Sequence, residues 1–529
     1  MREEILKTAR EKGLLLENEV VDLLESFNDG KRVSEFLQNL VIFSGQRLIT
    51  RSMLSKNAEY VQKFVRTLDK EGKESFENVS VKLGISLEIT KEKVITPGEE
   101  SMVELAKKRN SSDYQLFYAD TKPDKKIEVA DFTGYFRSRY QSLQRILIQR
   151  AGNANLVAVN KISSDRQNLS IIGMVTEKRM TKNKNLIISF EDLTGKIQTL
   201  TKFDKEEVFK KAQELQLDDI VLVKASGNKD ILFIQDIIFP DAIIQDKVKF
   251  ERDMSIAFIS DIHVGSKRHL EKGMQRFLDW IKSGDENAKK IRYLFIPGDN
   301  VDGVGIFPGQ EYALKLKSMK EQYAVLASYL RQIPKDITIF MCPGQHDAVR
   351  VAEPQPLIDR RYASELYGIE NLVLVTNPTL VKLLEGNKEF KVLMYHGASI
   401  HHFINEVPEL REMKAHKSPA KAVKHMLKRR HLAPMHGNIV YIPYMDVDPL
   451  VINEVPDVLC TGEVHRLDIE NYNGVLIITG SCWQAQTDFE EKVGNIPDPC
   501  KVPVLNLKTR ELKIFDFTDE DELKEVENA

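Results

Sequence analysis

The chain has 529 residues and a formal net charge of −3, and 42% of its residues are hydrophobic and 29% charged. This length is too great for one hydrophobic core and predicts about three domains, while the composition excludes a disordered or fibrous protein. The near-neutral balance excludes nucleic-acid binding through the field of the whole chain, so any such contact must come from local basic patches.

No stretch approaches the roughly 18 consecutive apolar residues that a membrane-spanning helix needs. The start of the chain, Met1–Lys7, carries no apolar signal region. We therefore expect an intracellular, cytoplasmic protein that has no membrane partner.

Residues 1–68 are predicted to form a small helical module. Apolar residues recur at three- and four-residue spacing over Glu17–Phe27 and Val33–Phe43, and an Asn-Asp-Gly turn separates the two segments. Residues 69–130 are rich in Lys and Glu and have few large apolar clusters. This composition predicts a charged, flexible linker with limited strand structure.

Residues 131–245 are predicted to form a basic helix followed by a β-barrel. The helix, Asp131–Arg150, carries arginines that could contact phosphate or hold the helix against the rest of the fold, and the sequence leaves both open. Over residues 168–241 the order is three strands, a helix near Glu206–Leu215 and two strands, as in an OB-fold barrel.

Barrels of this type often bind single strands on stacking aromatic side chains. The candidate faces hold few aromatic residues, namely Phe190, Phe203 and Phe233. A barrel that contacts another protein is therefore favoured over one that binds nucleic acid.

Residues 250–517 alternate strands with helices such as 270–282 and 315–331, which predicts a layered α/β domain. Alternation alone permits either one open sheet or two sheets. The last residues, 518–529, are acidic and are predicted to form a solvated, disordered tail.

Several segments of this α/β domain place potential metal ligands directly after short apolar, strand-forming runs. They are Phe258–His263, Phe295–Gly303, Phe340–Asp347, and the pair Leu393–His396 and Thr461–His465. Two divalent ions about 3.5–4 Å apart can hold the attacking and leaving oxygens of a phosphodiester displacement. They need a bridging carboxylate together with imidazole and oxygen ligands from several strands. The repeated pattern predicts a two-metal hydrolase site.

Two local features support that prediction. Asp261 and His263 are two residues apart, so on an extended strand their side chains point to the same side. Asp299 follows Gly298, where the backbone can turn sharply. All 11 histidines lie between His263 and His465, which favours a metal site confined to this domain.

Histidines outside these segments are predicted to be surface residues. Six of them lie in a stretch that is rich in Lys and Arg: His401, His402, His416, His425, His431 and His436. Within it, Lys428, Arg429 and Arg430 are predicted to form a basic surface toward DNA or a partner protein.

The strand-end segments resemble those of the calcineurin-like metallophosphoesterases. Met426–Pro434 and Leu450–His465 are similar to one branch of these proteins, the small subunits of the archaeal D-family DNA polymerase. The likeness extends from about Asp131 to Phe517. It implies a multidomain α+β protein, in which an N-terminal helical module and an OB-fold barrel precede a metallophosphoesterase domain of two packed sheets flanked by helices.

Carried over by position, the resemblance implies two metal ions. The first ion would take Asp261, His263, Asp299 and His465, and the second would take Asp299, Gln345, His396 and Glu463. His346 would act as the general acid or stabilise the departing oxygen, and Asp302 or Asp347 would orient it.

This chain departs from the family pattern at the second ion. The family has Asn at the position of Gln345 and His at the position of Glu463. Gln keeps the amide oxygen but adds a methylene, and the hard carboxylate of Glu favours Mn²⁺ or Mg²⁺ over softer metals. Two divalent ions are expected, with Mn²⁺ the first choice and Mg²⁺ the second. Either the site is retuned, or the second ion binds weakly and hydrolysis is impaired.

The resemblance implies a subunit of a heterodimeric, nucleoid-associated replicative DNA polymerase. This subunit would carry a proofreading 3′→5′ exonuclease for single-stranded DNA or the primer 3′ end, while a separate large subunit synthesises DNA and the complex contacts the sliding clamp. The alternative is a catalytically impaired scaffold that assembles the large subunit. A third possibility is an unrelated phosphoesterase acting on phosphoproteins or small nucleotides, which the barrel and Met426–Pro434 disfavour.

Overall fold

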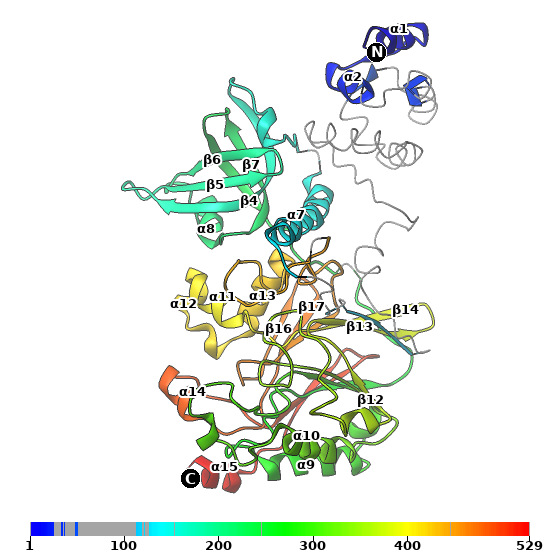
Figure 1. Ribbon diagram of the computed structural model, residues 1–529, viewed down its shortest axis with the longest axis vertical. Helices are drawn as coiled ribbons and strands as arrows, with labels where there is room; N and C mark the ends of the chain where they lie inside the picture. The colour runs from blue at the N-terminus through cyan, green and yellow to red at the C-terminus, as the bar shows by residue number, and fades with distance from the viewer. Residues whose placement is uncertain are drawn as a thin grey trace. The chain divides into compact units, whose positions relative to one another are not determined.

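The computed structural model describes residues 2–25, 33–34, 36–37, 48–50, 113–118, 121, 126–152, 154–244, 246–444 and 446–527. The chain forms two compact units. The first comprises residues 1–96, 147–212 and 221–238, and the second comprises 97–146, 213–220 and 239–529. Both mix helices with sheets (Figure 1), so the prediction of a mixed α/β protein is confirmed. Within the described residues, no helix has the length and apolar character to cross a membrane.

A closed five-stranded barrel forms most of the described part of the first unit, with its strands in the order β4-β5-β6-β8-β7. Its strands are β4 Gln167–Met180, β5 Leu186–Asp192, β6 Gly195–Thr201, β7 Ile220–Gly227 and β8 Leu232–Ile238, and α8 Glu206–Glu214 connects β6 to β7. This is the predicted order of elements. Phe190 is fully buried, whereas Phe203 is 55% exposed. Phe190 is therefore unable to stack on a base.

The described residues of the N-terminal part include two helices and a short parallel strand pair. They are α1 Arg2–Glu11, α2 Asn18–Glu25, β1 Leu15–Leu16 and β2 Leu48–Ile49. Most of the predicted helix over 33–43 lies outside the described residues, as does the predicted linker as far as residue 112. The end of that linker prediction is wrong, because β3 Tyr114–Phe117 pairs with β13 as an edge strand of a sheet.

Two six-stranded sheets form the centre of the second unit. The first has the order β12-β11-β10-β9-β18-β19, with β9 Ser255–Phe258, β10 Ile291–Pro297, β11 Thr338–Cys342, β12 Leu372–Leu374, β18 Lys501–Asn506 and β19 Leu512–Asp516. The second has the order β16-β17-β15-β14-β13-β3, with β13 Thr379–Glu385, β14 Lys388–Met394, β15 Val458–Thr461, β16 Asp468–Tyr472 and β17 Val475–Thr479.

One apolar cluster joins the two sheets. It contains Phe258, Phe295 and Phe340 from the first sheet together with Phe390 and Val392 from the second. Strands β9, β10 and β11, which contribute the three phenylalanines of the first sheet, are nearly continuous apolar runs because both of their faces are buried. Of the two arrangements that the alternation of strands and helices permits, the chain therefore adopts two packed sheets.

Helices cover the outer faces of the two sheets (Figure 1). A second cluster packs α9 Glu271–Lys282 and α10 Met319–Leu330 against the first sheet. A third packs α11 Ile400–Glu406, α12 Pro408–Glu412 and α13 Ala420–Arg429 against the second sheet. Strands β9, β10, β11 and β12 run parallel, as do β14, β15 and β17. Within each of these sets, the segments that follow the strands emerge at one edge.

The acidic C-terminal tail is ordered, which corrects the prediction that it is disordered. Residues Glu520–Glu527 form α15, and Glu522 is 5% exposed. The carboxylate of Glu522 accepts hydrogen bonds from the backbone N–H groups of Lys272 and Gly273, at 2.8 and 3.0 Å. These donors belong to the first turn of α9, where backbone N–H groups have no partner within the helix and a negative charge is stabilising.

The predicted basic helix is α7, Val129–Ala151. Its Arg139 is 2% exposed and donates to Asp448 Oδ2 at 2.6 Å and to the carbonyl of Pro434 at 2.5 Å. Tyr135 of the same helix stacks on Tyr441, with ring centroids 4.9 Å apart. Of the two roles left open for the arginines of this helix, Arg139 therefore has the structural one.

Candidate metal centre

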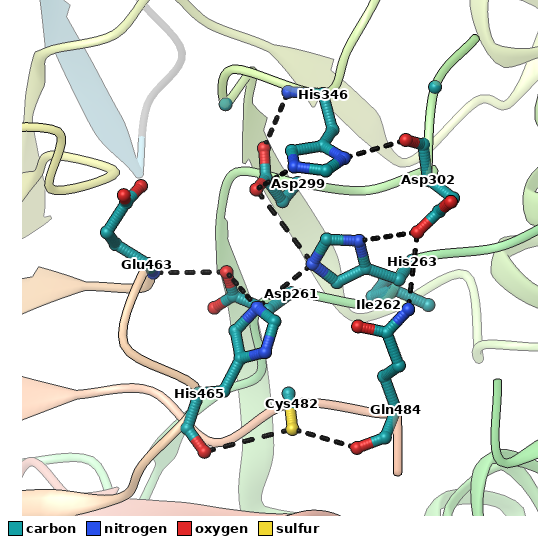
Figure 2. Close-up of polar contacts among 12 residues, drawn as sticks. Asp261, Ile262, His263, Asp299, Asp302, His346, Glu463, His465, Cys482 and Gln484 are labelled. Atoms are coloured by element: carbon teal, nitrogen blue, oxygen red, sulfur yellow. Dashed lines mark hydrogen bonds and ion pairs between the residues drawn. The ribbon is translucent and has the colours of Figure 1, made fainter. Parts of the chain in front are cut away.

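The strand-end segments meet at one cluster of imidazoles and carboxylates, part of which Figure 2 shows. Asp261 and His263 follow β9, Asp299 follows β10, and His346 follows β11. His396 follows β14, and Glu463 and His465 follow β15. Seven of the predicted site residues thus come together from two sheets: Asp261, His263, Asp299, His346, His396, Glu463 and His465.

The backbone at this cluster is strained. Asp261, His263, Asp299, Glu463 and His465 have φ values of 50°, 51°, 46°, 74° and 57°, in the left-handed region. Non-glycine residues held there cost on the order of 1–3 kcal/mol each when the conformation is unfavourable, and they concentrate at functional sites. Five such residues in one cluster indicate that the fold maintains this geometry for a function.

Glycines let the two sheets bring their ligands close together. A Cβ added at Gly344 would collide with the Asp299 carboxylate and would lie 2.8 Å from His396 Nε2. A Cβ added at Gly462 would lie 3.1 Å from Cγ of Asp261. Any larger residue at either position would push the ligand side chains apart.

All four imidazoles present the same nitrogen to the centre. Each Nδ1 has an acceptor: Asp302 Oδ1 for His263 at 3.1 Å, the Asp302 carbonyl for His346 at 2.7 Å, the Pro297 carbonyl for His396 at 2.8 Å and Glu490 Oε1 for His465 at 2.9 Å. Nδ1–H donation to these acceptors leaves the Nε2 lone pairs for the centre. This carboxylate- or carbonyl-supported arrangement is typical of metal-binding histidines.

The donor set fits divalent cations. His263 Nε2 lies 3.0 Å from His465 Nε2, where two neutral imidazoles would oppose their lone pairs unless a cation or a proton lies between them. Asp261 Oδ2 and Gln345 Oε1 are buried and have no hydrogen-bond partner among the described residues. Ligand atoms lie within 4.8 Å of one another in three groups: Asp261, His263 and His465; His263, Asp302 and His346; and Asp261, Asp299 and His396.

The charges of the cluster are strongly coupled. Burial disfavours charge on every member, yet Glu490 and the neighbouring carboxylates raise the pKa of His465 to about 9. Opposite charges likewise outweigh burial at Glu463, where His396 lowers the pKa to about 2. Protons thus balance the carboxylates when no metal is bound. Metal binding would release these protons, so metal affinity should rise with pH.

Two predicted orienting residues have different roles in the structure. Asp302 supports His346 through its backbone carbonyl, while its carboxylate holds His263 and accepts from Gln484 Nε2 at 3.2 Å. Asp347 is buried and accepts from Tyr323 Oη at 2.8 Å and from the backbone N–H of Gly344 at 2.9 Å. Asp347 therefore fixes the turn that carries His346, and of the two residues predicted as alternatives for orienting that imidazole, Asp302 is the one in contact with it.

Glu490 is the main site residue that the sequence analysis missed. It lies in α14, Asp488–Val493, where it also completes a capping box with Thr487. The Thr-x-x-Glu spacing at Thr487–Glu490 is a sequence signature for a helix start. That signature gives no indication that the same carboxylate holds His465, 25 residues away.

The predicted basic surface at 428–430 is wrong for its two arginines. Arg429 and Arg430 are 2% and 6% exposed. Arg429 Nε donates to Asp219 Oδ1 at 2.8 Å, and Arg430 Nε donates to the carbonyl of Ile452 at 2.6 Å. Lys428 donates to Glu214 Oε2 at 2.6 Å. The basic run thus holds together the interior of the second unit.

His401 was predicted to be a surface residue, and its side chain is 42% exposed, but it also borders the candidate metal centre. Its Nε2 lies 3.6 Å from Glu463 Oε1, while Glu463 Oε2 lies 3.1 Å from His396 Nε2. The imidazole of His401 thus lies beside Glu463, a predicted metal ligand at which this chain departs from the pattern of the resembling family.

We expect the substitution His401→Ala to weaken Mn²⁺ binding about tenfold, because loss of a partner that orients a ligand commonly costs 10–100-fold in metal affinity. Titration of Mn²⁺ followed by electron paramagnetic resonance would measure it. His401→Gln should restore part of the affinity through its amide N–H. His402→Ala is the matched control, and equal affinities in all four proteins would contradict a supporting role.

Comparison with known proteins connects this site with DNA polymerase subunits. The family described as the B subunit of DNA polymerases alpha and epsilon matches residues 256–467. The "DNA polymerase II small subunit" of Pyrococcus furiosus is 37% identical over 404 residues, which are 74% of this chain and 64% of that protein. The chain thus spans less than two thirds of that relative's length.

Proteins of the same name from other organisms are covered more fully. The one from Methanothermobacter thermautotrophicus is 37% identical, with 74% of this chain and 80% of that protein covered. The one from Archaeoglobus fulgidus is 39% identical, with 71% and 75% covered. A solved structure described as a novel archaeal phosphodiesterase has 14% identity and a TM-score of 0.25, covering 50% of this chain and 99% of that chain. A likeness of that size carries no inference.

Proposed function

Because the chain belongs to the family of DNA polymerase II small subunits, we propose that it is the metal-dependent 3′→5′ exonuclease subunit of a two-subunit replicative DNA polymerase. In this proposal a separate large subunit synthesises DNA, and this chain removes nucleotides from single-stranded DNA or the primer 3′ end. The barrel is an OB-fold that contacts a partner, and the two-sheet unit is a metallophosphoesterase domain.

One observation carries the proposal. Four imidazoles direct Nε2 toward two carboxylates, Asp261 and Asp299, within a strained and mostly buried cluster. Mixed imidazole and carboxylate ligands suit Mn²⁺ and Mg²⁺. One ion would be held by Asp261, His263, Asp299 and His465, and the other by Asp299, Gln345, His396 and Glu463. Bound ions would neutralise the phosphoryl charge and supply an activated nucleophile.

His346 is suited to proton transfer in this reaction. Its ring is fixed by donation from Nδ1 to the Asp302 carbonyl, and its Nε2 lies 3.9 Å from Asp299 Oδ2. Its side chain is 22% exposed, compared with 6% for Asp299 and 0% for His396. Burial lowers the pKa of His346, but Asp299 and Asp302 outweigh it and raise that pKa above its ordinary value. A protonated imidazole on the open side of the site can donate to a departing oxygen.

The test is degradation of 5′-labelled single-stranded DNA by the purified chain with Mn²⁺, alone and with the large subunit. We expect products that shorten from the 3′ end, and a rate reduced by about 100-fold or more in His346→Ala, because general acid catalysis contributes 10²–10⁴-fold. The exposed His436, which hydrogen-bonds Tyr441, provides the control variant His436→Ala.

The alternative is a scaffold with an impaired site. The observation that favours it is the change of ligands at the second ion, where Glu463 Oε2 already engages His396 Nε2 at 3.1 Å. Absence of metal-dependent cleavage, both alone and with the large subunit, would support the scaffold and overturn the exonuclease.

A further inference from the structure

A loop beside the metal centre exposes four large apolar side chains. We name residues 304–313 the rim loop. Val304, Ile306, Phe307 and Tyr312 are 45%, 40%, 44% and 77% exposed. The loop begins two residues after Asp302.

The rim loop is tied to the metal centre by a buried amide. Gln310 is 0% exposed, and its Nε2 donates to the carbonyl of Asp302 at 2.8 Å and to Asp302 Oδ2 at 3.2 Å. Its Oε1 accepts from the backbone N–H of Ile306 at 2.9 Å. The carboxylate that holds His263 therefore also holds the middle of the loop.

Both ends of the rim loop are held by hydrogen bonds, one to a side chain and one to the backbone. The N–H of Gly303 donates to Gln322 Oε1 at 2.9 Å, and Gln322 is fully buried. At the other end, the N–H of Lys267 donates to the carbonyl of Ala313 at 2.9 Å. Exposed aromatic side chains on a loop anchored in this way are held ready for contact, so binding would require little ordering.

The rim loop lies against the open side of the site. A Cβ added at Gly303 would collide with the carbonyl of His346 and would lie 2.8 Å from Cγ1 of Ile306. Among the proposed metal ligands and His346, the His346 side chain is the most exposed of those measured, at 22%. A strand that brings a phosphate to His346 would therefore come near the start of the rim loop, around Ile306.

We propose that the rim loop is a binding site for single-stranded nucleic acid, in which Phe307 and Tyr312 stack on bases next to the phosphate being cleaved. The ligand class rests on the proposed function. Every base has an aromatic face, so stacking binds a strand without reading its sequence. Lys317 and Lys320 follow within eight residues of Tyr312 and are exposed, which suits a phosphate backbone, whereas the exposed Lys315 is paired with Glu271.

The test measures binding without hydrolysis. A single strand carrying 2-aminopurine near its 3′ end is titrated with the chain in EDTA, and stacking is followed as quenching of the base fluorescence. We expect the double variant Phe307→Ala/Tyr312→Ala to lose most of the quenching and to bind at least about tenfold more weakly, as removal of stacking side chains generally does. Tyr362→Ala, at a residue that is 43% exposed outside the loop, is the control and should bind like the parent chain.

Three results would overturn the inference. They are absence of binding by the parent chain, equal quenching in the double variant, and a double variant that binds DNA normally but no longer binds the large subunit. The last result would assign the loop to a protein partner. Thermal unfolding confirms that the variants are folded. Hydrolysis with Mn²⁺ is measured separately, so quenching without cleavage would overturn the proposed exonuclease and leave base stacking in place.

Discussion

Replacing Asp299 with Asn should lower metal-dependent DNA hydrolysis by about a thousandfold or more. Asp299 Oδ2 lies 3.3 Å from His396 Nε2 and 3.9 Å from Nε2 of both His263 and His346, so it is the central carboxylate of the cluster. Metal ions contribute several kcal/mol to phosphoryl transfer, and each 1.4 kcal/mol is about a factor of ten in rate. The Asn side chain lacks the negative charge but keeps an oxygen that can accept the hydrogen bond from the backbone N–H of His346.

The decisive measurement is metal binding, because loss of activity alone has many causes. Titration of Mn²⁺ into parent and variant, followed by electron paramagnetic resonance, should show that at least one of two bound ions is lost. Asp279→Asn is the matched control, since that carboxylate lies on α9 and its side chain is 64% exposed. If Asp299→Asn still binds two ions with unchanged affinity, Asp299 is not the ligand shared by both ions.

That the predicted site residues lie close together could be predicted from the sequence, because a single rule determines it. Each of Asp261, Asp299 and His346 follows an apolar strand, and the ends of neighbouring parallel strands lie at one edge of a sheet. Adjacency then follows from strand order, without knowledge of side-chain contacts. The same reasoning applies to His396 and Glu463 after β14 and β15.

Residues that depend on distant partners could not be placed in this way. From the sequence, Arg429 is predicted to be a charged surface residue. In the structure it is buried and donates to Asp219, 210 residues earlier in the chain. From the sequence, the acidic tail is predicted to be solvated. In the structure Glu522 caps the start of α9, about 250 residues earlier in the chain. A run of charged residues predicts a solvent-exposed segment only as long as no buried partner for these side chains is known. Strand β3 was missed because four residues, Tyr114–Phe117, give too little periodicity.

The structure shows what surrounds Glu463, one of the two residues that differ from the family pattern at the proposed second ion. Glu463 is held between His396 on one side and His401 on the other. A carboxylate between two imidazoles can be a ligand or a structural ion pair, and the sequence alone does not separate these roles. Mn²⁺ titration of the His401 variants does separate them, because only a ligand transmits the loss of its support to the metal.

The substitution Asp448→Ala should destabilise the second unit by about 3–5 kcal/mol, because it leaves a buried charge without its partner. Arg139 and Asp448 are 2% and 0% exposed at their side chains, and Asp448 Oδ2 also lies 2.8 Å from His431 Nε2. Urea unfolding followed by tryptophan fluorescence reports on this unit, because both tryptophans of the chain, Trp280 and Trp483, lie within it. Glu365→Ala breaks an exposed pair with Arg331 and should cost under about 1 kcal/mol.

The pH dependence of that destabilisation provides a second check. Burial alone raises the pKa of Asp448, but Arg139 and His431 outweigh it and hold that pKa below its ordinary value. A carboxyl with a depressed pKa in the folded state contributes stability above its unfolded value of about 3.9 and loses it as the pH falls further. The difference between parent and Asp448→Ala should therefore be constant above about pH 5 and shrink below about pH 4.

The partner of that carboxyl titrates in the opposite sense. Burial lowers the pKa of His431 to about 4, whereas an unfolded histidine titrates near 6.5. The unfolded chain therefore binds this proton first, and the parent should lose stability relative to His431→Gln as the pH falls from about 6.5 to 4. Both proteins should keep the loss below about pH 4 that comes from Asp448. A parent that instead gains stability relative to His431→Gln over that range would show that His431 is charged in the folded state and that Asp448 is paired with two cations.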